Sequence, residues 1–255
     1  MKNDKRTFPL FGPGGNGDLF HLTKKKTVDA PAWVRDFGLD AYEYEAGRGF
    51  SAGEDVLLQV GQNAKEAGVF LSVHAPYFIS LSGTNPETRL KSIDYIEESV
   101  HAARLLGAET VVVHTGSAAK ITRAEAMALA ANTLTLMLER LDTDGVYIGL
   151  ETMGKVNQLG TLDEVINLCR ISPRLRPVVD FGHMNAREKG GYFKAEDDYK
   201  AVFDQIGSAL SDEVAKNLHC HFSKIEWTGA GEKRHLGLLF SLRVLGLTWS
   251  AAACR

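Results

Sequence analysis

The stretch Arg176-Pro-Val-Val-Asp-Phe-Gly-His183 joins a short apolar run to two residue types that bind metals. The run 177–179 is rich in valine, which favours a fully buried strand of a parallel sheet. It ends at Asp180, and His183 follows three residues later. Asp and neutral His are both ligands for a borderline cation such as zinc. Taken alone, the stretch is equally compatible with Asp180 capping a turn and His183 lying in a loop.

Similar apolar runs recur along the chain about every 30 to 40 residues, separated by longer segments of helical period. Such a regular strand–helix unit is typical of a parallel α/β array. A series of seven units in this sequence favours a TIM-type (β/α)8 barrel over a doubly wound sheet. We therefore expect a single barrel domain over residues 1–255. The predicted strands end near Gly12, Tyr44, His74, His114, Glu151, Phe181 and His221.

Helix signals lie between the predicted strands. Asn85 and the proline after it are typical of a helix start, and Gly107 is a typical helix end. Two capping boxes begin at Thr122 and Thr161, each with a Glu three residues later. The glycine-rich segment 11–17 lacks the Lys-Ser/Thr that follows in a phosphate-binding loop, so we predict a plain turn there.

The C-terminal part departs from this pattern. An eighth strand is expected about 30 to 40 residues after the seventh. The segment 233–255 contains no Asp or Glu, and 236–255 is apolar without a clean period. We therefore expect a barrel that is incomplete at the C-terminus, with strand eight missing or aberrant and residues 236–255 forming an atypical tail.

Composition narrows the class of protein only a little. The chain is 44% hydrophobic and 24% charged, an ordinary soluble composition, and it contains no apolar run long enough to cross a membrane. No apolar segment typical of a secretory signal follows the N-terminus. With a net charge of −3, nucleic-acid binding would need a local basic face or a metal cluster. The unpatterned cysteines Cys169, Cys220 and Cys254 fit free thiols in the cytoplasm.

Residues that bind metals gather at the predicted strand ends. In a barrel of this type the active site lies at the carboxyl ends of the strands. His183 and His235 fall just after two of these strands, whereas His21 and His101 fall outside the pattern. A single catalytic zinc uses about three protein ligands, so this surplus implies two or three ions. Paired metals are suited to displacement at a phosphodiester. The candidates at the strand ends are His74, His114, Glu151, Asp180 and either His219 or His221.

Five motifs together resemble, in order, the motif series of the endonuclease IV family. The resemblance runs from about Leu71 to His235 and implies an apurinic/apyrimidinic endonuclease, a DNA-repair hydrolase built on a xylose-isomerase-like TIM barrel with zinc ions. The motifs are His74-Ala-Pro-Tyr-Phe-Ile79, Val112-Val-His-Thr-Gly116, Gly149-Leu-Glu-Thr152, Asp180-Phe-Gly-His183 and His219-Cys-His-Phe-Ser-Lys224.

The resemblance also implies roles for individual residues. His74 and His114 would hold one zinc, and Glu151, the residue assigned to catalysis, would bridge it to a second. Asp180 and His219 would ligate the second ion, with His221 as the alternative to His219. His183 and His235 would hold the third. Mn²⁺ is the alternative to two or three Zn²⁺.

Two positions depart from the family pattern. An aspartate stands two residues before the last histidine in the family, whereas this chain has Lys233 there, with Glu232 one residue further away. The third zinc site would therefore either use Glu232, placed by a shifted loop, or have no carboxylate ligand. The family also takes a glutamate from strand eight, and the segment 236–255 offers no acid in that role.

The resemblance implies a DNA substrate that contains abasic sites. The family flips the damaged nucleotide out of the duplex by inserting side chains into the stack. Tyr77 and Phe78 align with its wedge residues, and Arg48 is a weaker candidate. The other interpretation of Tyr77 and Phe78 is a packed turn. We expect a monomer that cleaves the phosphodiester bond 5′ to the abasic site in base excision repair.

Two other functions remain open from the sequence. A sugar isomerase or epimerase of the related barrels needs about four ligands around one divalent ion, and Glu151, Asp180 and His219 would fit it. The histidines at the other strand ends would then be unused. The second alternative is an inactive, truncated member of the family that lacks the contribution of strand eight.

Overall fold

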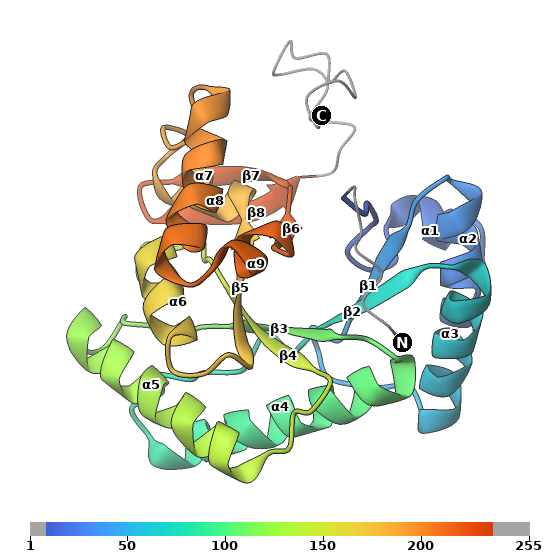
Figure 1. Cartoon of the computed structure of the whole chain (residues 1–255), viewed down its shortest axis with the longest axis horizontal. Helices are drawn as coiled ribbons and strands as arrows, with labels where there is room; N and C mark the ends of the chain where they lie inside the picture. Colours follow the sequence, from blue (N-terminus) through green and yellow to red (C-terminus); the bar gives the residue numbers. More distant parts are fainter. Residues whose placement is uncertain (1–8, 237–255) are drawn as a thin grey trace.

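The parallel strands of this protein curl into an open sheet, seen in the computed structural model that describes residues 9–236 (Figure 1). Within those residues, six strands form one sheet in the order β1-β2-β3-β4-β5-β6, and each pairs in parallel with the next. An antiparallel hairpin follows. The strands are β1 (Ala41–Glu45), β2 (Phe70–His74), β3 (Thr110–His114), β4 (Tyr147–Glu151), β5 (Leu175–Asp180), β6 (His219–His221), and the hairpin strands β7 (Lys224–Thr228) and β8 (Gly231–Leu236).

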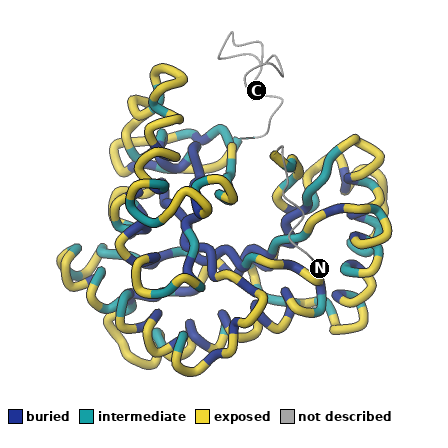
Figure 2. The backbone as a smooth tube through the Cα atoms, viewed as in Figure 1, coloured by how far each residue is buried: buried dark blue, intermediate teal, exposed yellow. Residues whose placement is uncertain are grey.

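Helices cover the outer face of the curled sheet, as the outer band in Figure 1 shows. They pack their apolar faces on the strands, so burial concentrates in the sheet and on the inner side of each helix (Figure 2). The helices are α1 (Asp18–Leu22), the 3₁₀ helix η1 (Thr27–Asp29), α2 (Ala30–Asp36), α3 (Glu54–Ala67), α4 (Pro86–Leu106), α5 (Arg123–Arg140), α6 (Leu162–Cys169), α7 (Phe181–Arg187), α8 (Glu196–Ala209) and α9 (Asp212–Lys216).

Within residues 9–236, the open six-stranded sheet agrees with the incomplete TIM-type barrel predicted from the sequence. Six predicted strand ends lie within one residue of the observed ends; β4 ends at Glu151 and β5 at Asp180, for example. The alternation of strand and helix therefore determined the fold class. Of the predicted C-terminal tail 236–255, only Leu236 lies within the described residues, where it ends β8.

The segment 11–15 is not the plain turn that we predicted. It runs parallel beside β1, where Ala41 N donates to Phe11 O at 3.0 Å and Glu43 N donates to Pro13 O at 3.1 Å. Gly15 N then donates to Glu43 O at 2.9 Å. Glycine at position 12 permits this approach, because a Cβ there would overlap the backbone of Ala41. The first predicted strand is thus an extended segment that forms backbone hydrogen bonds with β1 at the edge of the sheet.

The predicted helix caps are confirmed. The Asn85 side chain accepts from Glu87 N at the start of α4, and Gly107 ends that helix with a left-handed φ of 70°. Both Thr122 and Thr161 form complete capping boxes. These caps fix where each helix begins, and with it the loop that leaves the preceding strand.

Two of the predicted free thiols, Cys169 and Cys220, are free, and Cys254 lies outside the described residues. Among the helices of residues 9–236, none has the length and apolar character of a membrane-crossing segment.

Candidate metal centre

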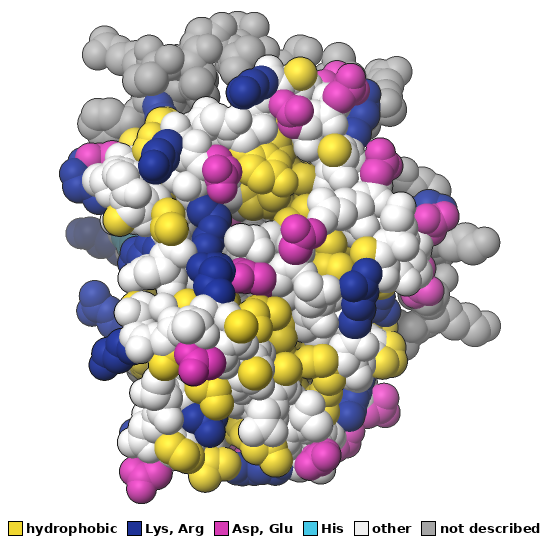
Figure 3. Space-filling model, turned by 90° about the vertical axis from the view of Figure 1, so that its left-hand side faces the viewer, with side chains coloured by type: hydrophobic (Ala, Val, Ile, Leu, Met, Phe, Trp, Pro, Cys, Tyr) yellow, Lys and Arg dark blue, Asp and Glu magenta, His cyan; other side chains and the backbone are white. Residues whose placement is uncertain are grey.

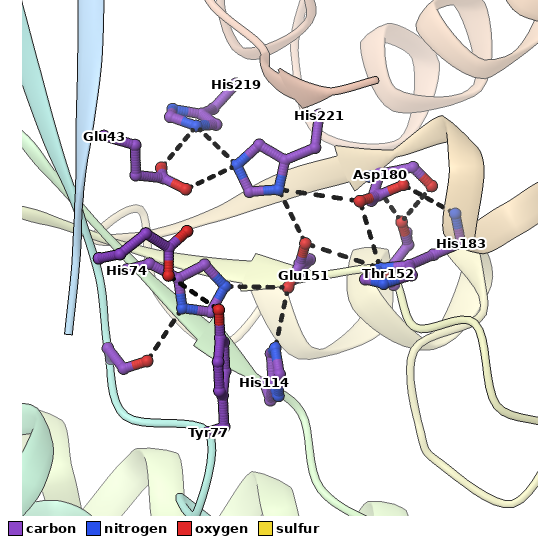
Figure 4. Close-up of polar contacts among 12 residues, drawn as sticks. Glu43, His74, Tyr77, His114, Glu151, Thr152, Asp180, His183, His219 and His221 are labelled. Carbon is purple, nitrogen blue, oxygen red and sulfur yellow. Dashed lines mark hydrogen bonds and ion pairs between the residues drawn. The ribbon is translucent and has the colours of Figure 1, made fainter. Parts of the chain in front are cut away.

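The carboxyl ends of the strands bring imidazoles and carboxylates together on the inner side of the curled sheet (Figure 4). Five of these side chains stand on the last residue of their strand, whereas Glu43 lies in the middle of β1 and His219 begins β6. Their sequence positions span nearly two hundred residues. The group comprises Glu43 on β1, His74 on β2, His114 on β3, Glu151 on β4, Asp180 on β5, and His219 and His221 on β6.

Glu151 lies at the middle of this group. Its Oε2 atom is 3.2 Å from His114 Nε2 and 3.5 Å from His74 Nε2. Its Oε1 atom is 2.8 Å from His221 Nδ1. The side chain is only 2% exposed, and no hydrogen bond reaches Oε2. A buried carboxylate oxygen that faces two imidazole nitrogens without a hydrogen bond is the arrangement that a divalent cation would complete.

The electrostatics of the group act in opposite directions on its two central carboxylates, Glu151 and Asp180. Burial by itself would raise the pKa of Glu151, but the imidazoles of His114 and His221 help to hold it well below its usual range. Burial would lower the pKa of His74, yet Glu151 raises it to about 9. The pKa of Asp180 is raised by burial, although nearby His183 opposes this. Without a metal ion, protons on His74 and His221, whose pKa values are both raised, balance part of the negative charge.

Hydrogen bonds determine which histidine nitrogens face the centre. His74 Nδ1 lies 2.9 Å from Ala75 O, and His183 Nδ1 lies 2.9 Å from Thr152 O. A carbonyl oxygen only accepts hydrogen bonds, so in both rings Nδ1 carries a proton, and Nε2 is the nitrogen that can bind an ion once the ring is neutral. His183 is therefore oriented to bind a metal through Nε2, although its Nδ1 also lies 3.5 Å from Asp180 Oδ2.

Asp180 also begins the next helix. Its Oδ1 atom accepts from His183 N at 2.7 Å, which caps α7 and holds His183 in the first helical turn. Asp180 therefore both caps a helix and lies beside the cluster, whereas His183 lies in α7 and not in the loop of the alternative interpretation. Because Oδ2 is not used by the cap, it remains available to the centre.

The hairpin β7–β8 brings an acid and a histidine to His183. Glu232 Oε2 is 3.6 Å and His235 Nε2 is 3.2 Å from His183 Nε2. The β7–β8 register shifts between Glu226 and Trp227, so that Glu226 pairs with Arg234 and Trp227 with Glu232. Lys233 is the extra residue of this bulge, and its Nζ lies 2.5 Å from Glu226 Oε1.

A glycine permits the close approach of this hairpin. Glu232 N donates to Gly154 O at 3.0 Å, and a Cβ on Gly154 would lie 2.7 Å from the Cβ of Glu232. That distance is too short for any other residue, so the loop after β4 can touch the hairpin only at a glycine. The shifted position that the sequence left open for Glu232 is the one that the backbone adopts.

The two histidines of β6 have different neighbours. We predicted His219 beside Asp180, with His221 as the alternative. In the structure, His221 Nδ1 is 2.8 Å from Glu151 Oε1 and 4.0 Å from Asp180 Oδ2. His219 Nε2 instead lies 3.1 Å from Glu43 Oε2. The geometry therefore favours His221 beside Glu151 and Asp180.

The candidate DNA-contacting residues lie at the edge of the same centre. Tyr77 stacks on the His114 ring, with centroids 5.4 Å apart, and its hydroxyl donates to Glu45 at 2.8 Å. Phe78 packs edge-on against Tyr95 at 4.5 Å, which partly fits the packed-turn interpretation, yet it is 48% exposed. Arg48 is exposed in the loop after β1, which bonds to Tyr77 N through Gly47 O. These three residues share one side of the centre.

A large basic surface is not seen on the face in Figure 3, where Lys and Arg side chains lie among acidic and apolar ones. Two basic residues of the hairpin strand β8, Lys233 and Arg234, both pair with Glu226 on β7. His101, which lay outside the predicted ligand pattern, pairs with Glu54 at 2.8 Å on the surface of α4.

Glu43 is the site residue that sequence reasoning missed. It is 6% exposed between the buried residues Tyr42 and Tyr44. Burial by itself would raise the pKa of Glu43. The imidazoles of His221 and His219 nevertheless hold this pKa well below its usual range. The signal was present in the segment Tyr-Glu-Tyr: an acid flanked by aromatic residues in a short strand is rarely buried without a charged partner.

Comparisons with known proteins agree with the fold and the motifs. The sequence model of the xylose isomerase-like TIM barrel family matches residues 31–242. The chain is 29% identical over 215 residues to an uncharacterized protein of Methanocaldococcus jannaschii, covering 84% of this chain and 76% of that protein. It is 28% identical over 193 residues to "Probable endonuclease 4" of Staphylococcus carnosus, covering 73% of this chain. The chain spans less than two thirds, 64%, of that relative's length.

Solved structures share the fold at lower identity. Endonuclease IV from Thermus thermophilus aligns with a TM-score of 0.62 and 21% identity, covering 91% of this chain and 82% of that one. D-psicose 3-epimerase, solved in the presence of D-fructose, aligns with a TM-score of 0.60 and 16% identity over 87% of this chain and 94% of that one. At these identities the likeness establishes the architecture that nucleases and epimerases share, not the choice between them.

Proposed function

Because the chain belongs to the xylose isomerase-like TIM barrel family, we propose that it is a zinc-dependent endonuclease that cleaves DNA 5′ to abasic sites. The sequence relatives named "Probable endonuclease 4" and the five motifs in order support the choice of a nuclease within this family. DNA that contains abasic sites would be the substrate, and a hydrolysed phosphodiester bond the result.

One observation carries the proposal: the number and grouping of candidate ligands. Within residues 9–236, four groups of three His, Asp or Glu side chains each present atoms within 4.8 Å of one another. One ion with about three or four protein ligands would leave most of these side chains without a role. The groups are His74–His114–Glu151, Glu151–Asp180–His183, His183–Glu232–His235 and Glu43–His219–His221.

The first ion would be held by His74, His114 and Glu151. Glu151 would extend to the second ion through its other oxygen, beside Asp180, while the Nδ1–H of His221 orients that oxygen. His183, Glu232 and His235 would hold the third. When bound, the ions would supply a nucleophile at neutral pH and stabilise charge on the phosphodiester oxygens. The chain's own contribution is to orient these ligands through buried hydrogen bonds and to keep Glu151 and Glu43 ionised.

DNA would enter from the side where Arg48, Tyr77 and Phe78 lie. Tyr77 and Phe78 are 53% and 48% exposed, and aromatic rings in such positions can replace a flipped nucleotide in the stack. Arg48 would meet the phosphate backbone from the adjacent loop. The stack of Tyr77 on His114 connects this contact surface to the first ion position.

The direct test uses zinc-loaded protein and a labelled duplex with one abasic-site analogue. We expect incision on the 5′ side of the lesion and no cut in the undamaged duplex. His114→Gln should reduce incision at least about 100-fold, since even outer-shell changes at metal sites cost 10- to 100-fold. The matched control is His101→Gln, a histidine on the surface of α4, which should cut as the unchanged protein does. A protein with two or three bound zinc ions that leaves the abasic duplex intact contradicts the proposal.

A sugar isomerase or epimerase is the rival function on this fold. Glu151, Asp180 and a β6 histidine provide three of the roughly four ligands that one ion needs. The separate group His183–Glu232–His235 has no role in that scheme, which favours the nuclease. One Mn or Mg ion per chain, with turnover of a ketose, would favour the rival; two or three zinc ions, with no turnover of a ketose, would favour the nuclease.

A further inference from the structure

Glu43, His219 and His221 form a cluster whose members come from the two ends of the sheet (Figure 4). Glu43 lies on β1 and the two histidines on β6, the first and last strands in the order β1 to β6. These strands do not pair with each other in the described sheet, yet the three side chains are in contact. The five motifs include both histidines but not Glu43, so they do not account for this cluster.

The two imidazole nitrogens lie at similar distances from each other and from the Glu43 carboxylate, and each faces a different carboxylate oxygen. Glu43 Oε2 is 3.1 Å from His219 Nε2, Glu43 Oε1 is 3.0 Å from His221 Nε2, and the two Nε2 atoms are 3.2 Å apart. In tetrahedral zinc sites with bonds of about 2.0–2.1 Å, ligand atoms lie about 3.3 Å from one another. The measured separations are close to that spacing, so one zinc-sized ion would fit between the Glu43 carboxylate and the two imidazoles.

The His221 ring is oriented for metal binding through Nε2. Its Nδ1 lies 2.8 Å from Glu151 Oε1, and a charged carboxylate can only accept, so Nδ1 carries the proton. Nε2 lies 3.0 Å from Glu43 Oε1, so without an ion it also carries a proton; a bound ion would displace that proton and take the Nε2 lone pair. A carboxylate that fixes the far nitrogen of a ligating histidine is the usual outer-shell arrangement at zinc.

A hydrogen bond from a neighbouring strand also fixes the position of the Glu43 carboxylate. Ser72 on β2 donates its hydroxyl to Glu43 Oε2 at 2.8 Å. The Glu43 side chain is 7% exposed, whereas those of His219 and His221 are 28% and 21% exposed. The carboxylate is therefore buried and fixed, and the two imidazoles leave a path by which an ion can arrive.

We propose that Glu43, His219 and His221 bind a divalent transition-metal ion of the zinc class. This position lies on the Nε2 side of His221, whereas the motif-derived second position lies on the Nδ1 side, beside Glu151 and Asp180. The inference goes beyond the proposed function, since it concerns metal binding and holds for either a nuclease or an isomerase. The ion would link β1 to β6 across the open side of the sheet.

Metal counting tests the proposal on the full chain. Zinc per chain would be measured by elemental analysis after dialysis against a zinc buffer, for the unchanged protein, Glu43→Gln and His219→Gln. Each variant should hold one zinc fewer than the unchanged protein. Substituting Co²⁺ and following its visible absorption should show the loss of one tetrahedral ion in both variants. Neither readout depends on DNA cleavage, so failure of the nuclease proposal would leave this result intact.

A variant of the outer contact serves as the matched control. Ser72→Ala keeps all three ligands and should keep the zinc count while weakening the affinity of one ion about 10- to 100-fold. Far-ultraviolet circular dichroism would verify that each variant is folded, and His219→Gln provides an independent arm if Glu43→Gln does not fold. Zinc and cobalt contents unchanged in a folded Glu43→Gln or His219→Gln would overturn the proposal, because the cluster would then be a proton-bridged ion pair.

Discussion

Tyr77 separates two contributions of one side chain, the aromatic ring and the hydroxyl. The ring stacks on His114 and is half exposed, and the hydroxyl donates to Glu45. If the ring enters the duplex, Tyr77→Ala should weaken binding to an abasic duplex about 10-fold, since stacking on a base is worth roughly 1–3 kcal/mol. Tyr77→Phe should bind within about twofold of the unchanged protein. Fluorescence anisotropy on abasic and intact duplexes measures both, and equal affinity for Tyr77→Ala and Tyr77→Phe would exclude the wedge role.

Glu164 is a residue whose contribution depends on pH. Arg123 binds both of its oxygens, at 2.6 and 2.7 Å. Burial would raise the pKa of Glu164, but Arg123 and the backbone donors of the Thr161 capping box lower it from 4.5 to about 2. A lowered carboxyl pKa stabilises the folded state fully above about pH 4.5, and that stability is lost as the pH falls toward 2.

Glu164→Gln should therefore destabilise the protein by about 1–2 kcal/mol at pH 7, a figure reduced for the partial exposure of the pair. The difference from the unchanged protein should be constant between pH 7 and 5 and should shrink below about 4.5. Urea unfolding at several pH values measures it. Glu98→Gln, an exposed acid on α4, is the control and should stay within about 0.5 kcal/mol. A Glu164→Gln difference that grows in acid would refute the assignment.

At the scale of elements, the bulge in β7–β8 decides which of two neighbouring residues reaches the metal centre. Glu232 faces His183 with a side chain 12% exposed, whereas Lys233 is 53% exposed and pairs with Glu226. Glu232→Gln should remove one zinc per chain, because a neutral amide is a poor zinc ligand. Lys233→Gln should leave the zinc count unchanged. Elemental analysis of the two variants checks this, and a loss of zinc in Lys233→Gln alone would show that the register is different.

The elements were largely predictable from sequence, and particular residues show why. Val178 and Val179 mark a buried strand through composition, and Thr122 and Thr161 mark helix starts through local hydrogen bonds, so both signals act over a few residues. Glu232 could be placed only with the register of a hairpin, and a bulge shifts that register by one residue. Local patterns therefore predicted where strands end but not which neighbour of Lys233 faces inward.

Glu43 and the β6 histidines show the same limit for the site. Strand ends predicted that His74, His114, Glu151 and Asp180 converge, because parallel strands share one edge. Which of His219 and His221 lies beside Glu151 could not be predicted from the alternation of side chains along a strand. Residues two apart face the same side of β6, so both histidines are equally placed by that rule. The choice depends on how far Glu43 reaches across from β1, which is a property of the curl of the whole sheet.

At the scale of the whole molecule, the candidate ligands tie together strands that hydrogen bonds do not. Glu43 and His221 connect β1 with β6, and His183 and Glu232 connect α7 with β8. In the described residues the sheet pairs only successive strands, so its curl is secured by helix packing and by these contacts. Ions bound only to the folded state would add stability through mass action.

Metal removal should therefore destabilise the whole fold. An ion present at 1,000 times its dissociation constant adds about 4 kcal/mol, so chelation should lower the melting temperature by several degrees for each ion removed. Zinc added back should restore it. Thermal unfolding followed by circular dichroism, with and without a chelator, measures the shift, and an unchanged melting temperature would show that no structural ion is bound.

The pH dependence of this zinc effect follows from His74. Glu151 raises the His74 pKa from 6.5 to about 9, so the metal-free pair stabilises the fold below about pH 6.5, and that stability is lost as the pH rises through 9. Zinc needs the neutral imidazole and must displace this proton. The gain in melting temperature on adding zinc, held at fixed free concentration by a metal buffer, should therefore increase from pH 6.5 to 9. His74→Gln removes the competing proton together with the ligand, so its zinc gain should be smaller and should depend less on pH. A zinc gain that falls as the pH rises would mean that His74 does not bind the ion.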